Sequence, residues 1–369
     1  MNPALPGIRL RSLDVFRGIT LASMVLVNDP GSEEHTYAQL EHATWNGWTF
    51  TDTVFPFFVW IAGVALTLSF AKRIERGDSR RTLFLHVLRR ALLIFAVGLF
   101  LNGFPYFHFD RIRYLGVLQR IAICYLISAG LFLVLKIRGL IAAVVTLLAC
   151  YWLLVMLVPV PGCGAGSLSQ DCNLEKYIDG IFLTGHMWSH TKTWDPEGIV
   201  STLPAIASML FGILTGYILR ISQPPAKKTV WILLQGILLM IAGQIMNLWL
   251  PINKSIWTSS YSVFMAGLAS LVFAVCYWVV DANKWQRWSA FFRIYGMNAL
   301  AVFILTGMIG RLLGIIHVNG ESLETWIYQN AFEPLASPIN PSLLYAIANV
   351  LFYFLLIWIM YRRGWFLRV

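Results

Sequence analysis

Roughly ten stretches of about twenty mainly apolar residues run along this chain, and they constrain its fold more than any other feature. Inside a bilayer the backbone has no water to bind, so only helices and closed barrels can cross it. The expected spans are 13–29, 50–70, 82–101, 115–135, 139–158, 199–219, 229–248, 259–280, 289–312 and 342–361. The sequence therefore predicts an all-α polytopic membrane protein, with one domain over residues 1–369 built as a bundle of about ten transmembrane helices.

The composition agrees with a protein that is dissolved in lipid. Of the 369 residues, 58% are hydrophobic and 12% are charged, whereas a soluble domain carries about 25% charged residues. Aromatic residues make up 14% of the chain, which suits anchoring at the two membrane–water interfaces. The segment 1–14 shows no small-residue cleavage site after the first apolar run, so we expect that run to stay as a span.

The net charge of +10 could suggest a nucleic-acid partner, but the positions of the charges argue against one. Lys and Arg collect in alternate connectors, as the positive-inside rule requires. These connectors are 9–11, 72–81, 136–138, 220–228, 281–287 and 361–368. With ten spans they all fall on one side together with both termini, and the rule makes that side the cytoplasm. We therefore expect no nucleic-acid partner and two cytoplasmic termini.

The cysteines divide into two groups. Cys124, Cys150 and Cys276 lie in apolar spans, where we expect them to pack. Cys163 and Cys172 share the long outer loop 159–198. An oxidising compartment on that side permits a disulfide between them, and we expect one.

Several ionisable residues fall inside expected spans, where they cost a few kcal/mol each and usually mark function. Asp14 and Arg17 lie three residues apart on one helical face, either as a structural ion pair or as part of a site for an anionic ligand. Arg89 and Arg90 enter the third span from the cytoplasm. Arg120 lies too deep in the fourth span to reach water easily, so we expect a buried partner or an anionic ligand for it.

Other polar residues gather toward the outer surface. Asn28 ends the first span and His42 follows after a short loop, so we expect the two side chains to be close. Asp52 lies in the first turn of the second span, where the helix dipole favours a carboxylate. Asn253, Lys254 and Trp257 share this surface, and Asn298 falls within the ninth span.

The long outer loop adds two histidines and two carboxylates. His186 and His190 have a spacing that suits a metal ion on a helix, but no third ligand stands nearby in a recognisable pattern, so we expect no metal site. The segment Asp195–Glu197 is expected to cap the span that follows it. From the residues alone, a membrane-embedded transferase and a secondary transporter of a sugar or amino sugar both remain open. The absence of an internal repeat favours the transferase.

Six sequence blocks in this order then resemble one family over nearly the whole chain. They are RLRSLDVFRGITLASMVLVND, EHATWNGWTFTDTVFPFFVWIAG, RRALLIFAVGLFLNG, YLGVLQRIAICY, WDPEGIVSTLPAIASMLFGILTG and NKSIWTSSY. The chain resembles the transmembrane acyltransferases related to heparan-α-glucosaminide N-acetyltransferase. It looks like a compact bacterial member without the large extra luminal domain, which implies a multi-pass protein of the bacterial inner membrane.

The resemblance implies transfer of an acetyl group from cytosolic acetyl-CoA to the amine of glucosamine or a related amino sugar on the periplasmic side. It places the catalytic histidine at His42 and its asparagine partner at Asn28. An imidazole can take the proton of the attacking amine near neutral pH, or it can carry the acetyl group itself. Asp52 or Glu41 would orient the ring, and the amide of Asn28 would face the developing oxyanion.

The resemblance also implies two binding regions and a possible homodimer. The CoA phosphates need cations, and the candidates for cofactor binding are Arg17, Arg89, Arg90, Arg120 and Arg293. The candidates for amino-sugar binding are Glu41, Trp45, Asn46, His186, Glu197, Asn253, Lys254 and Trp257.

Overall fold

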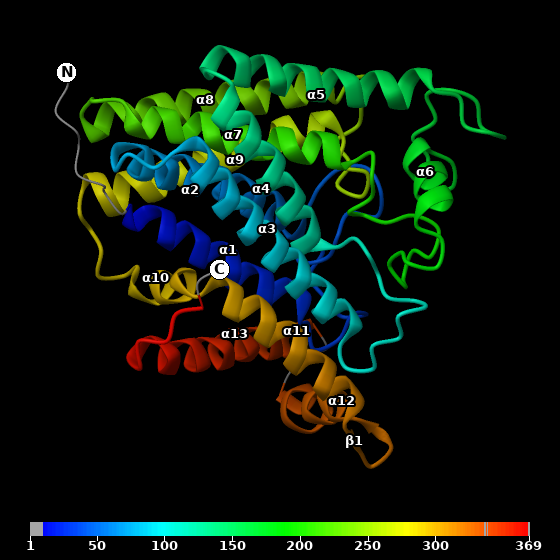
Figure 1. Ribbon diagram of the computed structural model, residues 1–369. Helices are drawn as coiled ribbons and strands as arrows, with labels where there is room; N and C mark the ends of the chain where they lie inside the picture. Colours follow the sequence, from blue (N-terminus) through cyan, green and yellow to red (C-terminus); the bar gives the residue numbers. More distant parts are fainter. Residues whose placement is uncertain (1–9, 336, 338, 368–369) are drawn as a thin grey trace.

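The computed structural model describes residues 10–335, 337 and 339–367 (Figure 1). Its long helices are α1 (Arg11–Asn28), α2 (Val54–Glu75), α3 (Arg80–Gly103), α4 (Val117–Val134), α5 (Ile137–Leu157), α7 (Thr202–Arg220), α8 (Pro225–Met246), α9 (Ser259–Tyr277), α11 (Ala299–Ile315) and α13 (Ile339–Arg362). The short elements are η1 (Thr51–Thr53), α6 (Leu174–Phe182), η2 (Trp278–Ala282), α10 (Ala290–Met297), β1 (His317–Val318), β2 (Glu321–Ser322), α12 (Leu323–Ile327), η3 (Tyr328–Phe332) and η4 (Glu333–Leu335). Arg9, which begins the first basic connector, and both chain ends lie outside the described residues.

The predicted all-α membrane architecture is confirmed. Within the described residues, 8 helices are long and apolar enough to cross a membrane, and the bent pair α10 and α11 would make a ninth. Helix α1 was expected as the first span but is less apolar, because Arg11, Asp14 and Arg17 fall within its 18 residues. The two strands form only a small hairpin between α11 and α12.

Helix α1 runs through the middle of the bundle with α10 packed against it (Figure 1). A Cβ added at Gly18 would lie 1.7 Å from the carbonyl oxygen of Phe292, and one at Gly296 would lie 1.9 Å from that of Asp14. The two backbones therefore touch, which only glycine at both positions allows. The predicted ion pair is confirmed, since Arg17 Nη1 lies 3.4 Å from Asp14 Oδ1. The polar groups of α1 thus face protein rather than lipid.

The expected ninth span, 289–312, is broken within its length. The chain bends by 79° between α10 and α11, and Asn298 lies at the break. Its buried side-chain amide donates to the carbonyl oxygen of Trp365 at 3.1 Å and accepts from the backbone nitrogen of Leu367 at 3.2 Å. A break of this kind is tolerated at membrane depth when protein groups surround the freed backbone. The close contact with α1 fixes the direction of α10, whereas α11 runs in a different direction.

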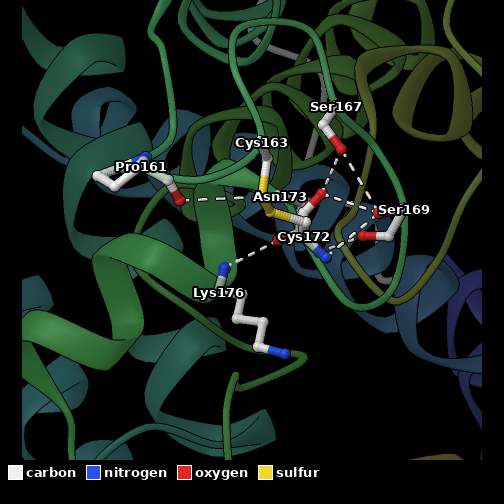
Figure 2. The surroundings of a disulfide bond; sticks show 7 residues. All are labelled: Pro161, Cys163, Ser167, Ser169, Cys172, Asn173 and Lys176. Atoms are coloured by element: carbon white, nitrogen blue, oxygen red, sulfur yellow. Dashed lines mark hydrogen bonds between the residues drawn. A yellow bond between two sulfur atoms is a disulfide. The ribbon is translucent and has the colours of Figure 1, made fainter.

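The long outer loop is closed as predicted by a disulfide between Cys163 and Cys172. Figure 2 shows this bond with the side chains of Ser167 and Ser169 beside it, and both hydroxyls donate to the carbonyl oxygen of Cys172. Asn173 then caps α6 by accepting from the backbone nitrogen of Lys176 at 2.8 Å. Of the cysteines in spans, Cys124 and Cys276 are buried as expected, whereas Cys150 is exposed on α5.

The contact between α1 and α10 can be tested with a matched pair of substitutions. Gly296→Ala should lower the thermal unfolding temperature in detergent, because overpacking at a closed contact costs about 1–3 kcal/mol. Gly130→Ala in α4 should leave it unchanged or raise it, since a Cβ there meets nothing within 4 Å and alanine favours a helix. Equal unfolding temperatures for the two variants would contradict the packing described for α1.

Candidate active site

The carboxylate of Asp52 anchors the loop that carries His42. Asp52 lies in η1 directly before α2 and is 1% exposed. Its Oδ1 is 2.6 Å from His42 Nδ1, and its Oδ2 accepts from the backbone nitrogens of Ala43 and Thr49, both at 3.0 Å. Both oxygens of this buried group therefore have partners, and one side chain fixes both ends of the loop 42–49.

His42 presents one ring nitrogen to this carboxylate and keeps the other for chemistry. With Nδ1 protonated, the ring donates to Asp52, and Nε2 carries the lone pair that can accept a proton. The side chain of His42 is 50% exposed, so the ring remains accessible. Lys254 Nζ lies 3.4 Å from both ring nitrogens. The imidazole is thus held between a carboxylate and an ammonium group.

Lys254 reaches this position because two outer loops pair with each other. The backbone nitrogen of Gly47 donates to the carbonyl oxygen of Ile252 at 2.7 Å. The side-chain amide of Asn253 donates to Asn46 Oδ1 at 3.2 Å. Burial lowers the pKa of Lys254, although the nearby carboxylates of Glu197 and Asp52 act in the opposite direction.

Arg113 joins two further carboxylates beside Lys254. Its Nε and Nη2 donate to Asp195 at 2.8 and 2.5 Å, and Nη2 also contacts Glu197. Burial raises the pKa of Glu197, but Arg113 first, and then Arg120 and Lys254, bring it below its usual value. Asp195 does not cap the following span as expected, because α7 begins at Thr202 and the carboxylate is engaged by Arg113 instead.

Arg113 was not among the residues selected from the sequence, although a signal for it was present. It lies in the loop 102–114, one of the connectors in which the predicted topology leaves few cations. A basic residue that breaks the charge pattern of its side is a candidate partner for acidic residues there. The fully buried Asp179 of α6 was missed too, and it holds the same segment by accepting from the backbone nitrogens of Asp195 and Ile199, both at 3.1 Å.

Arg120 has buried partners, as its depth in the span predicted, and they belong to the segment that leads into α7. It is 1% exposed, and Nη2 donates to the carbonyl oxygen of Gly198 at 3.1 Å and to Ser201 Oγ at 2.5 Å. Its guanidinium lies 5.2 Å from the ring centroid of the fully buried Trp257. Arg120 and Trp257 therefore support the start of α7.

The remaining candidates for the cofactor lie on other helices. Arg17 pairs with Asp14 on α1, and Arg293 is partly buried on α10. Arg90 on α3 lies 5.2 Å from the ring of Tyr125, whereas Arg89 is exposed. Two of these arginines lie on the packed helices α1 and α10, and the other two lie on α3.

Three of the candidates for sugar binding lie around the cluster rather than in it. Glu41 is exposed and its carbonyl oxygen accepts from Thr49 Oγ1 at 2.5 Å. Trp45 donates to the carbonyl oxygen of Leu168 at 2.9 Å, so the disulfide-closed loop holds its ring. His186 lies in a turn and not in a helix; it stacks on Tyr114 at 3.8 Å and its Nδ1 is 2.8 Å from the carbonyl oxygen of Ile112.

Asn28 lines a cavity of about 250 Å³ together with Arg113 and Gln119. In the part of the chain that the structure describes, His42 is not among the lining residues of this cavity. The side chain of Arg113 therefore belongs both to the cavity wall and to the ion-pair cluster that it forms with Asp195 and Glu197.

Comparison with known proteins decides the family. Residues 9–224 match the family model described as heparan-alpha-glucosaminide N-acetyltransferase, catalytic. The chain belongs to this family. The matched region contains Asn28, His42, Asp52, Arg113 and Glu197, and it ends before Lys254.

Two curated members of the family show the extent of the likeness. The human (Homo sapiens) heparan-alpha-glucosaminide N-acetyltransferase is 30% identical over 355 residues, which cover 82% of this chain and 53% of the human protein. The mouse (Mus musculus) protein of the same name is 28% identical over 350 residues, which cover 80% of this chain and 53% of the mouse protein. The chain spans about half the length of these relatives.

The ion pairs of Arg113 should stabilise the folded protein. Arg113→Met leaves Asp195 and Glu197 without their cation, and loss of one partner of a buried pair costs about 3–5 kcal/mol. We expect a clear drop in the thermal unfolding temperature in detergent. The control is Arg111→Met, two residues away, whose side chain is 84% exposed and which should behave as the parent protein. An unchanged unfolding temperature for Arg113→Met would contradict a structural role of the cluster.

Proposed function

We propose that this protein is a transmembrane N-acetyltransferase that moves an acetyl group from cytosolic acetyl-CoA to the amine of glucosamine or a related amino sugar on the periplasmic side. The observation that carries the proposal is the setting of His42, with Nδ1 on the buried Asp52 carboxylate and Nε2 accessible. Membership of a family whose matched model is named catalytic supports it.

In this proposal His42 accepts the proton of the attacking amine. An amino sugar is protonated near neutral pH, and its nitrogen has no lone pair until that proton leaves. Nε2 of His42 takes one proton, and the freed amine attacks the thioester carbonyl to form a carbon–nitrogen bond. The carbon–sulfur bond then breaks, and the departing CoA thiolate takes up the second proton that the nitrogen loses, so that the amide and CoA thiol are the products. Asp52 holds the ring in the tautomer that this step needs and stabilises the imidazolium that forms. In the second route the imidazole carries the acetyl group before the amine receives it.

The developing oxyanion needs donors, and two side chains are candidates. The Asn28 amide is the one implied by the family resemblance. The Lys254 ammonium is the second, because it already lies 3.4 Å from the ring nitrogens of His42. A donor aimed at the oxygen that gains charge stabilises the transition state more than the substrate.

The acetyl donor, acetyl-CoA, would bind toward the opposite end of the bundle. We assign the CoA nucleotide to the cytoplasmic side, with Arg17, Arg89, Arg90 and Arg293 as the cations for its phosphates. Arg120 is left out of this set, because its bonded partners belong to the outer cluster. The topology proposed is that of a single-domain protein of the bacterial inner membrane with both termini in the cytoplasm, and the assembly proposed is a homodimer.

The test is acetylation by the purified protein in detergent. Labelled acetyl-CoA and glucosamine should give N-acetylglucosamine, and His42→Ala should lower the rate by about 10²–10⁴-fold, the contribution of a positioned general base. Asp52→Asn should also lower it strongly. His35→Ala is the matched control, since His35 is an exposed histidine of the same outer loop, and it should keep the parent rate. Uptake of labelled glucosamine into liposomes without acetylation would support the transporter instead.

A further inference from the structure

Parts of four helices line the cavity beside Asn28. Its walls come from the last residues of α1, the end of α3, the start of α4 and the middle of α11. At about 250 Å³ it has room for roughly eight water molecules, and so for a small organic ligand. In the predicted topology these helix ends all lie toward the outer side of the membrane, away from the proposed CoA nucleotide.

Two buried polar atoms near this cavity have no hydrogen-bond partner among the described residues. Gln119 is 1% exposed, lines the cavity, and its Nε2 is one of them. Asp29 also lines the cavity, and its Oδ2 is the other. A buried polar group without a partner costs about 1–3 kcal/mol. An unpaired donor and an unpaired acceptor in one cavity wall therefore indicate a ligand that supplies both.

The position of Gln119 depends on two glycines. A Cβ at Gly98 would lie 2.5 Å from Gln119 Oε1, and one at Gly116 would lie 3.1 Å from it. Helices α3 and α4 therefore leave room for the amide at this point of the wall, and larger residues would displace it.

The other lining groups identify the class of ligand. Phe303 and Leu118 provide apolar surface, and Asn28 and Arg113 add an amide and a guanidinium. A sugar ring combines an apolar face with hydroxyls at its edge, so it suits a wall of this kind. The carboxyl of Asp29 can accept a hydrogen bond from the amine of such a ring, and the guanidinium of Arg311 adds further donors for its hydroxyls.

One ion-pair cluster connects the cavity wall with the surroundings of His42. Arg113 lines the cavity and bonds Asp195 and Glu197. Glu197 is close enough to Lys254 to affect its charge, and Lys254 contacts His42. Ligand groups in the cavity are therefore next to Arg113, whose carboxylate partner Glu197 lies near the lysine that contacts the proposed base.

We propose that this cavity binds the sugar ring of the acceptor, an amino sugar, with the Gln119 amide and the Asp29 carboxylate as partners of its polar groups. This inference rests on the proposed function, because it assigns a place to the acceptor of that reaction. It makes Gln119 a residue that sets acceptor affinity and leaves the affinity for acetyl-CoA to other parts of the protein.

A substitution in α11 can fill the cavity without disturbing the backbone. Gly307 lines the cavity, and a Cβ there would meet only Leu101, at 3.5 Å, an ordinary contact. The side chain of Gly307→Leu therefore enters the cavity. Gly314→Leu is the matched control on the same helix, since a Cβ at Gly314 meets nothing within 4 Å and this residue does not line the cavity.

The experiment compares the KM for glucosamine with the KM for acetyl-CoA in the purified full-length protein. Gly307→Leu and Gln119→Leu should each raise the KM for glucosamine at least tenfold and leave the KM for acetyl-CoA unchanged, whereas Gly314→Leu should match the parent. A raised KM for acetyl-CoA with an unchanged KM for glucosamine would overturn the proposal, because the cavity would then belong to the donor. Unchanged values for both substrates would overturn it as well.

A direct measurement of glucosamine binding distinguishes failure of this inference from failure of the proposed function. If the parent protein acetylates nothing, calorimetric titration with glucosamine still decides. Binding by the parent and by Gly314→Leu, with loss of binding by Gly307→Leu, would uphold the cavity while the acetyltransferase reaction fails. Failure of the parent to bind glucosamine, or equal binding by Gly307→Leu, would overturn the cavity proposal.

Discussion

The buried carboxylate of Asp52 is the constraint on which the loop around His42 depends. It is almost inaccessible to water, yet both of its oxygens are paired, one with the ring of His42 and the other with two backbone amides of the same loop. The hydroxyl of Tyr261 in α9 donates to its carbonyl oxygen at 2.6 Å, which ties the loop to the core of the bundle. A carboxylate buried at this depth without such partners would be strongly destabilising. The loop conformation and the burial of Asp52 therefore require each other.

Charges elsewhere at this end of the molecule are also arranged in groups that compensate one another. Arg113 neutralises Asp195 and Glu197, and Arg120 bonds the start of α7 and faces the ring of Trp257. These contacts join three stretches that are far apart in the sequence, residues 113–120, residues 195–201 and Trp257. Loss of one partner leaves another charge buried, so we regard the cluster as one interdependent group rather than as a set of independent ion pairs.

The sequence predicted what depends on local pattern. Hydrophobic length predicted the helices, and the resemblance to a family selected His42 and Asn28. The sequence left Asp52 and Glu41 as alternatives for orienting the ring of His42, and the structure places Asp52 at 2.6 Å from it. The features that were missed or wrong depend on contacts between distant segments. The break at Asn298 follows from the contact of Gly296 with α1 and from the C-terminal segment that Asn298 bonds. The sequence around Asp195 predicts a helix cap. Its pairing with Arg113 depends on a contact between distant segments, which no local pattern predicts.

The central claim is that His42 serves an acceptor on one side of the membrane with an acetyl group that comes from the other. The most direct test uses sealed right-side-out membrane vesicles that contain the protein, with labelled acetyl-CoA trapped inside and glucosamine attached to impermeant beads outside. The account predicts that label appears on the beads, and that it does not with His42→Ala. Label that appears only when acetyl-CoA and the beads are on the same side of the membrane would contradict the account.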